Sequence, residues 1–121
     1  MTTPARLRRK DETLIELLVG SGMAKNLAKT LVVLAKREET TSVEIEKATG
    51  LRQPEVSIAM QELRALGWVE KRDIKKEGKG RPVHSYHLAV PFGTIVESLT
   101  RDAKKRLDAI EDNLRRLRAY L

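Results

Sequence analysis

The hydrophobic periodicity of the chain changes at Gly67, and this change constrains the fold more than any other feature of the sequence. Before Gly67, residues 42–49 and 54–66 carry apolar side chains at helical spacing, and a tight turn separates the two stretches. After Gly67, residues 68–74 and 83–90 are rich in β-branched and aromatic side chains, which is typical of strands. This order predicts two helices around a tight turn, followed by a β-hairpin.

Further helices are predicted on both sides of this unit. Apolar side chains at helical spacing predict helices at residues 11–19 and 24–37, and a last helix from about Phe92 to the end. The expected fold class is mainly α with a small β-hairpin: a winged helix-turn-helix domain plus a long C-terminal helix. We expect three regions, namely a basic N-terminal arm at 1–10, the winged helix-turn-helix domain at 11–90 and the C-terminal helix at 91–121.

The positive charge of the chain is concentrated in a few segments. The 121 residues include 24 Lys and Arg against 17 Asp and Glu, a net charge of +7. Residues 6–10 and 71–81 each carry a net +4 and residues 82–121 carry +2, whereas residues 11–70 carry −3. This segregation favours a polyanion touched at several places: nucleic acid first, and an acidic membrane surface second. The alternative is an arm and a loop that are merely solvated.

What the sequence lacks disfavours several function classes. The absence of cysteine removes disulfides, thiolate metal sites and cysteine nucleophiles. His84 and His87 stand three apart on a predicted strand and would point to opposite faces, so we expect ordinary polar contacts and no metal site. No catalytic arrangement or phosphate-binding glycine loop is recognisable, so we expect neither an enzyme nor a cofactor. Without an apolar run of membrane-spanning length or a signal core, we expect a cytoplasmic, nucleoid-associated protein with no membrane partner.

The second helix of the pair has the two faces that reading a DNA groove requires. The expected apolar back is Val56, Ala59, Met60, Leu63 and Leu66. The expected front holds side chains that can pair with base edges in the major groove, namely Arg52, Gln53, Glu55, Ser57, Gln61 and Arg64. Ile58 also points to the front; it would contact a thymine methyl, or the domain interior is larger than expected. A polar helix front alone is usually only a solvated face.

Two basic segments are expected to hold DNA phosphates beside this helix. The hairpin tip, or wing, offers Lys75, Lys76, Lys79 and Arg81, and the N-terminal arm offers Arg6, Arg8, Arg9 and Lys10. Basic residues at a hairpin tip can also serve only to keep a strand edge soluble.

The stretch TTSVEIEKATGLRQPEVSIAMQELRALGWVEKRD resembles the winged helix-turn-helix core of bacterial and archaeal regulators of the MarR, ArsR and TrmB type. The shared pattern includes a short helix, a glycine turn, a helix start with proline, and Leu63, Leu66, Gly67, Trp68 and Val69 before the wing. The match covers residues 24–90, and Trp68 stands where Leu or Tyr is commoner. The short helix at 11–19 and the Ser21-Gly22-Met23 lead-in look closest to short archaeal TrmB-like proteins. The resemblance implies that residues 53–66 are the recognition helix and 74–82 the wing. It leaves a small-molecule effector unknown.

The C-terminal helix is predicted to form a dimer interface. Its apolar residues from Leu99 onward recur at steps of three and four, which is typical of a coiled coil. A helix of about 30 residues would reach about 45 Å, beyond the rest of the domain. The expected interface residues are Leu99, Leu107, Ile110, Leu114 and Leu117. The alternative is that these residues pack back onto their own domain.

These observations predict sequence-specific binding of double-stranded DNA by a homodimeric transcriptional regulator. One alternative is an architectural, largely non-specific chromosome-coating protein with the same fold. Another is a winged helix used only for protein contacts, which the basic wing disfavours. The target DNA sequence, and activation as opposed to repression, have no signature in the sequence.

Overall fold

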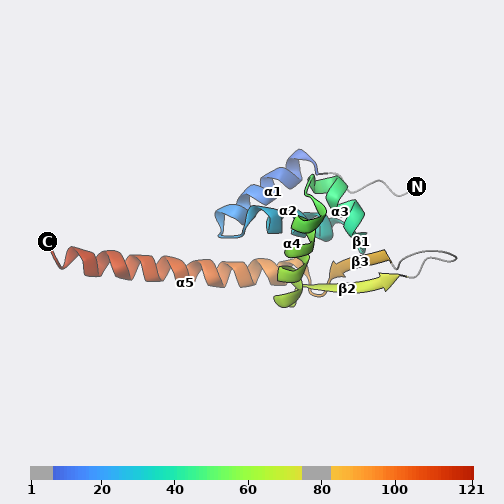
Figure 1. Ribbon diagram of the computed structural model, residues 1–121. Coiled ribbons are helices and arrows are strands. Elements are labelled where there is room, and N and C mark those ends of the chain that lie inside the picture. Colours follow the sequence, from blue (N-terminus) through green and yellow to red (C-terminus); the bar gives the residue numbers. More distant parts are fainter. Residues whose placement is uncertain (1–6, 75–82) are drawn as a thin grey trace.

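The computed structural model describes residues 7–74 and 83–121 as five helices and three short strands (Figure 1). In chain order these are α1 (Arg9–Gly20), α2 (Lys25–Lys36), β1 (Thr40–Thr41), α3 (Ser42–Thr49), α4 (Gln53–Ala65), β2 (Val69–Ile74), β3 (Val83–Leu88) and α5 (Phe92–Arg118). The expected fold class, mainly α with a small β-hairpin and a long C-terminal helix, is confirmed.

Residues at the two ends of α3 determine where this first helix of the helix-turn-helix begins and ends. The Thr41 hydroxyl accepts a hydrogen bond from the Glu44 backbone N–H at 3.2 Å, and the Glu44 carboxylate accepts one from the Thr41 backbone at 3.1 Å. This reciprocal pair satisfies two backbone donors at the start of α3. Gly50 ends α3 with φ 75°, a left-handed conformation that glycine adopts without strain.

Gly67 ends α4 in the same way and begins the hairpin. Its φ is 78°, and its backbone N–H donates to the Arg64 carbonyl while that of Trp68 donates to the Leu63 carbonyl. These two bonds are the closing pattern that a left-handed glycine permits at a helix C-terminus. The change of periodicity at Gly67 therefore corresponds to a sharp change of chain direction from α4 into β2.

The hairpin strands form a three-stranded antiparallel sheet in the order β1-β3-β2. Asp73 pairs with His84 and Val69 with Leu88 along the hairpin, while Thr40 of β1 pairs with Tyr86 on the other edge of β3. The two-residue strand β1 was not predicted from the sequence. It anchors the start of α3 to the hairpin and so fixes the helix-turn-helix relative to strand β3.

The core lies around α2, which packs against α1, α3 and α4. Seven of its twelve residues are buried, which gives this helix an apolar face wide enough to contact several neighbours. The largest fully buried side chains of the domain are Leu31, Leu34, Ile45, Met60, Leu63 and Ile95. They come from α2, α3, α4 and the first turn of α5, so one core joins all of these elements.

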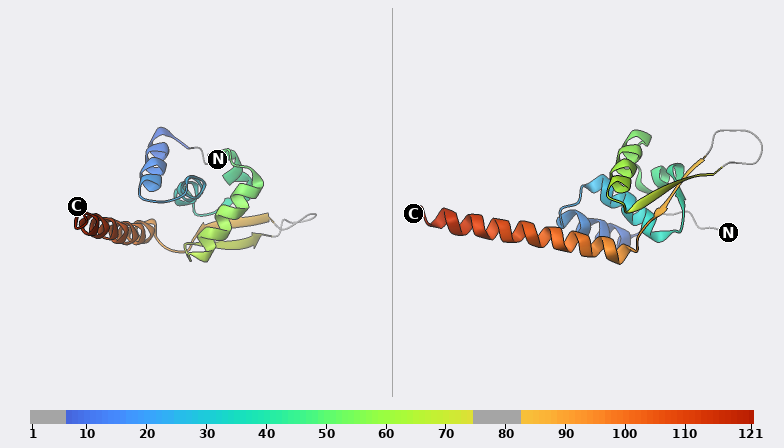
Figure 2. Two further views of the ribbon diagram at one scale, coloured as in Figure 1. Left: turned by 60° about the vertical axis from the view of Figure 1, so that its left-hand side comes forward. Right: turned by 90° about the horizontal axis from the view of Figure 1, so that it is seen from below.

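Helix α5 is 27 residues long and extends away from the domain (Figures 1 and 2). Ile95 is fully buried, and Phe92 and Leu99 pack partly buried against the core. Farther along, the Arg106 guanidinium donates a hydrogen bond of 2.7 Å to the Ser21 carbonyl in the turn between α1 and α2. At about 1.5 Å per residue the helix is about 40 Å long, and its C-terminal part extends away from the other described elements (Figures 1 and 2).

Two details of the expected fold are wrong. Helix α1 begins at Arg9, two residues before the expected start, because the Asp11 carboxylate accepts a hydrogen bond from the Arg8 backbone N–H at 2.7 Å. Leu66 was expected on the buried back of α4, but it is 53% exposed because the helix ends at Ala65 and the chain turns outward at Gly67.

Candidate nucleic-acid interface

Helix α4 is held by its apolar face, which leaves its other side free for a partner. Val56, Ala59, Met60 and Leu63 are buried, and α4 packs on α2 and α3 through them. Pro54 lies in the first turn, where a missing backbone N–H costs no helical hydrogen bond. Ile58 is exposed on the outer side, as the sequence predicted.

Four predicted base-reading residues share one side of α4, which we call the polar flank: Gln53, Ser57, Gln61 and Arg64. Their spacing of four, four and three residues places them one above the other along the helix. Gln53, Gln61 and Arg64 are exposed and Ser57 is half-buried. None of the four forms a side-chain hydrogen bond or ion pair with another residue in the described part of the chain, so their polar atoms are available to a ligand.

The polar flank borders a shallow hollow between α4 and β2. The hollow has a volume of about 580 Å³ and is lined by Gln61, Arg64, Ala65, Val69, Glu70 and Lys71. Lys71 was not among the predicted site residues, because only the hairpin register shows that it lies beside α4. Arg64 and Lys71 bring two positive charges to this hollow, and Glu70, which lies 3.0 Å from His87 Nε2, brings one negative charge.

Tyr86 lies on β3 directly across from Lys71 and is buried. Burial raises the pKa of the Tyr86 hydroxyl, and the positive charge of Arg64 partly opposes that rise. Tyr86 therefore stays neutral at physiological pH.

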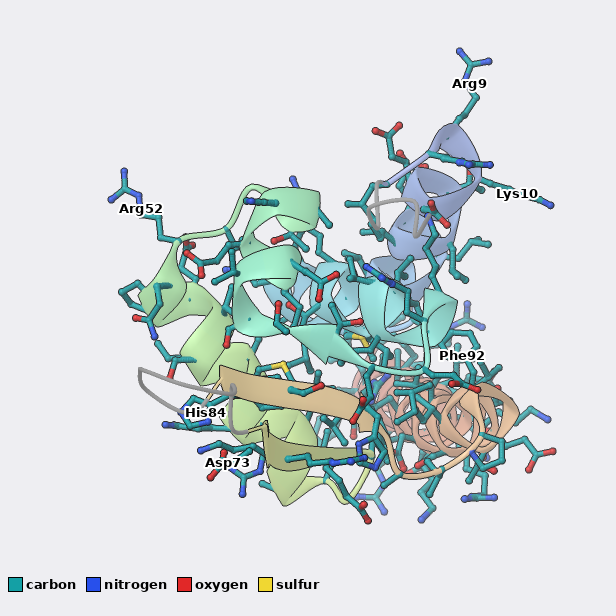
Figure 3. The ribbon with its side chains drawn as sticks, turned by 90° about the vertical axis from the view of Figure 1, so that its right-hand side faces the viewer. Arg9, Lys10, Arg52, Asp73, His84 and Phe92 are labelled. Carbon is teal, nitrogen blue, oxygen red and sulfur yellow. The ribbon has the colours of Figure 1, made fainter. Side chains whose placement is uncertain are left out.

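The two histidines make separate polar contacts, as predicted. His84 Nδ1 lies 2.7 Å from an Asp73 carboxylate oxygen, and His87 Nε2 lies 3.0 Å from one of Glu70. The hydrogen bond with His84 is the main cause that lowers the pKa of Asp73. Figure 3 shows Asp73 and His84 side by side, near the end of β2 and the start of β3. Across residues 7–74 and 83–121, no group of three or more His, Asp or Glu side chains is arranged to hold a metal.

Glu55, predicted to accept from cytosine, is engaged in the structure of the domain itself. One carboxylate oxygen accepts a hydrogen bond of 3.0 Å from the Arg52 backbone N–H, and the other accepts one of 3.3 Å from the Asn26 side chain of α2. Its side chain is half-buried between the two helices. We therefore correct this assignment: Glu55 caps α4 and joins it to α2. Arg52 remains exposed at the start of α4.

The predicted phosphate contacts lie mostly outside the described residues. This holds for all four wing residues, Lys75, Lys76, Lys79 and Arg81, and for Arg6 of the arm. Of the remaining arm residues, Arg8 caps α1, whereas Arg9 and Lys10 belong to its first turn and are exposed. Figure 3 shows Arg9 and Lys10 projecting on the far side of the domain from Arg52. The structure does not bring these two residues together with the polar flank.

A second basic group, which sequence reasoning missed, surrounds an open hollow of about 680 Å³ between α1, α2 and α3. It includes Lys25, Lys29 and Lys47, with Glu12 and Glu16 on the same rim. Lys25 and Lys29 lie one turn apart on α2, as Glu12 and Glu16 do on α1, but only the packing of three helices brings these pairs together with Lys47.

Helix α5 carries apolar side chains that its own domain does not cover. We call Leu107, Ile110, Leu114 and Leu117 the distal cluster; they are between 55% and 66% exposed. The alternative that these residues pack back onto their own domain is therefore wrong. Leu99, predicted with them, packs instead against the core, because it lies on the side of α5 that faces the domain.

The described helices include none that is both long and apolar enough to cross a membrane. This holds for α5 as well, since charged side chains recur along its whole length.

Together, the helix-turn-helix, the three-stranded sheet and the hairpin define a winged helix-turn-helix protein. Residues 28–80 match the MarR family. The match covers less than half of the chain, and the fold recurs in many solved structures. No curated protein sequence matches it significantly.

Three solved structures illustrate the likeness. One is TrmBL2, described as an archaeal chromatin protein with a novel mode of DNA binding, with a TM-score of 0.63 and 15% identity over 90% of this chain. Another is a possible transcriptional regulator from Methanosarcina mazei Go1, with a TM-score of 0.61 and 13% identity over 87% of this chain and 86% of that one. The third is the multiple antibiotic resistance repressor MarR, with a TM-score of 0.53 and 21% identity over 83% of this chain and 71% of that one. This chain spans only 40% of the length of TrmBL2.

Proposed function

We propose that this protein binds double-stranded DNA as a homodimer and regulates transcription in a sequence-specific way. The polar flank of α4 enters the major groove, and the wing residues Lys75, Lys76, Lys79 and Arg81 contact phosphates. The observation that carries this proposal is the polar flank itself: four polar side chains in register, without hydrogen bonds or ion pairs to other described residues, on the helix that follows the tight turn. Side chains of this kind pair with base edges in the major groove.

The charge of the molecule supports the same proposal. Arg64 and Lys71 line the hollow beside the polar flank, and the basic segment 75–81 follows directly after β2. Base-reading and phosphate-binding groups would therefore meet one duplex from the same side of the domain. MarR and TrmBL2 are a repressor and a chromatin protein by their own descriptions, and both share this fold.

The homodimer is proposed from the distal cluster. A protruding helix with four large apolar side chains more than half exposed is unusual for a monomer, because exposed apolar surface of this kind favours association. A two-fold dimer would offer two copies of α4 to two half-sites. The chain would then act in association with the chromosome.

A salt-dependent binding assay tests this proposal. Affinity for a duplex selected from a random pool, and for the unselected pool, is measured at several salt concentrations. We expect the logarithm of each affinity to fall linearly with the logarithm of salt, and the selected duplex to bind at least about 10³-fold more tightly. Equal affinity for both duplexes would favour the architectural role, and no salt-dependent binding would refute DNA binding altogether.

Two variants test whether the polar flank is responsible for the preference for the selected duplex. Gln61→Ala is expected to reduce the preference for the selected duplex, because Gln61 is exposed beside the hollow and free of other contacts in the described chain. Lys10→Ala serves as the matched control, since Lys10 is exposed on the far side of the domain. A larger loss of preference in Lys10→Ala than in Gln61→Ala would contradict the placement of the interface.

A further inference from the structure

The exposed apolar surface of α5 is longer than the distal cluster. Val96 is 40% exposed although it lies in the first turns of α5, and Thr100 beside the domain is exposed too. Together with the distal cluster these residues form one continuous line along the helix, which we call the seam: Val96, Thr100, Ala103, Leu107, Ile110, Leu114, Leu117 and Leu121. The steps along the seam alternate strictly between four and three residues, the heptad spacing of a coiled coil.

The charged residues beside the seam distinguish a parallel pairing of two α5 helices from the antiparallel registers. In a coiled coil, the residues that flank the apolar positions face each other across the interface and set partner orientation. On one side of the seam these are Glu97, Lys104, Glu111 and Arg118. None of the four forms an ion pair with another residue in the described part of the chain, so each is available to a second copy.

An antiparallel arrangement with Leu107 opposite Ile110 of the second copy uses the whole seam. Val96 then lies opposite Leu121, Thr100 opposite Leu117 and Ala103 opposite Leu114. In this register Lys104 faces Glu111 of the second copy, and Glu97 faces Arg118. Two-fold symmetry repeats each pair, so four ion pairs of opposite charge form and no like charges meet.

The two alternatives match the charges less well. An antiparallel register with Leu107 opposite Leu117 leaves Val96 and Thr100 uncovered, sets Glu111 against Glu111 of the second copy, and sets Lys104 against Arg118. A parallel pairing offers a single kind of opposite-charge pair, Arg106 with Glu111 of the second copy. The Arg106 guanidinium, however, already donates to the Ser21 carbonyl at 2.7 Å and faces the domain.

We propose that two copies of this chain pair through an antiparallel coiled coil of α5 in which Leu107 faces Ile110, and that Glu97, Lys104, Glu111 and Arg118 select this register. The proposal rests on the proposed homodimer and specifies its geometry. It places the two winged domains at opposite ends of the coil. The two copies of Phe92 then lie about 50 Å apart along its axis, at about 1.5 Å per residue.

Disulfide cross-linking tests the register, because the chain has no cysteine of its own. The double variant Thr100→Cys/Leu117→Cys is expected to form a covalent dimer on mild oxidation, since the two positions face each other between copies. Leu117→Cys alone and Leu107→Cys/Leu117→Cys should remain uncrosslinked. Cross-linking of Leu117→Cys alone would show a parallel coil, and cross-linking of only Leu107→Cys/Leu117→Cys would show the other antiparallel register. Either result overturns the proposal.

Charge reversal tests the residues that select the register. Lys104→Glu is expected to weaken dimerisation by on the order of ten-fold, because two attractive pairs become repulsive, and Lys104→Glu/Glu111→Lys should restore it. Lys105→Glu is the matched control: it makes the same change one residue away, on the outer face of the helix. Equal weakening by Lys104→Glu and Lys105→Glu would contradict the assigned pairs.

Sedimentation of the unmodified protein tests the homodimer separately from the register of its coiled coil. A dimer that fails to cross-link in Thr100→Cys/Leu117→Cys would refute the register while leaving the proposed homodimer intact. A monomer at all accessible concentrations would refute the homodimer, and the register with it.

Discussion

Replacing Ile110 and Leu114 by glutamate is expected to separate the dimer into folded monomers. Full burial of a leucine or isoleucine side chain is worth about 1.5–3 kcal/mol. Both residues are 55% exposed in the single chain, so an interface recovers roughly half of this, about 0.8–1.5 kcal/mol for each side chain. The dimer contains four such side chains, and their loss amounts to about 3–6 kcal/mol, or roughly 10²–10⁴-fold in the dissociation constant.

This figure is a lower bound, because a glutamate without a partner is costly to bury. Sedimentation should therefore show a monomer at concentrations where the unmodified protein is a dimer. The winged domain should stay folded, since every buried core residue precedes Val96. Affinity for DNA should fall steeply, because two linked half-site contacts become one.

Lys105→Glu/Ala109→Glu is the control, with two glutamates on the outer face of the same helix. A double variant at Ile110 and Leu114 that remains a dimer with unchanged DNA binding would refute the assigned interface.

Three further predictions concern the DNA interface and the helix-turn-helix. Changing Lys76, Lys79 and Arg81 to Ala should weaken binding to all duplexes about equally and flatten the salt slope by roughly 0.9 per lost phosphate contact; unchanged affinity for random DNA would show that the wing is no phosphate clamp. Gln53→Ala or Ser57→Ala should lower the preference for the selected site by about 1–3 kcal/mol and leave random-DNA affinity nearly unchanged; equal losses on both duplexes would favour the architectural role. Glu44→Gln should destabilise the domain by up to about 1 kcal/mol at neutral pH, because it removes the carboxylate charge that pairs with the Arg37 guanidinium, and denaturant unfolding measures this.

The pH dependence of the last effect follows from the surroundings of Glu44. Burial would raise the pKa of this carboxyl, but the hydrogen bonds from Thr41 and the Arg37 guanidinium outweigh it and lower the pKa below the usual 4.5. A carboxyl with a lowered pKa stabilises the folded state above its unfolded value, and this contribution is lost as the pH falls through the folded value. The difference between the unmodified protein and Glu44→Gln should therefore shrink below about pH 4.5. A difference that grows on acidification would contradict this reasoning.

Sequence reasoning succeeded where the signal is local. The ends of α3 and α4 at Gly50 and Gly67 could be predicted because the left-handed conformation of a glycine depends on the local backbone alone. The spacing of the apolar residues in α2 and α4 likewise indicated which faces of these helices are buried. It failed where a residue's role depends on a distant neighbour. The capping and bridging role of Glu55 requires Asn26, which lies 29 residues earlier.

The same limit explains the other differences. Strand β1 is only two residues long and exists because it pairs with β3, more than 40 residues later. The place of Lys71 beside α4 depends on the hairpin register. The extension of the apolar line of α5 back to Val96 and Thr100 appears only once Ile95 and Leu99 are seen to face the domain.

Genome-wide DNA occupancy of the tagged, full-length protein tests the central claim most directly. A dimeric, sequence-specific regulator predicts sharp sites that share a motif of two symmetry-related half-sites, and the loss of these sites in the Ile110→Glu/Leu114→Glu variant. Broad coverage without a motif, or no enrichment on DNA at all, would contradict the account.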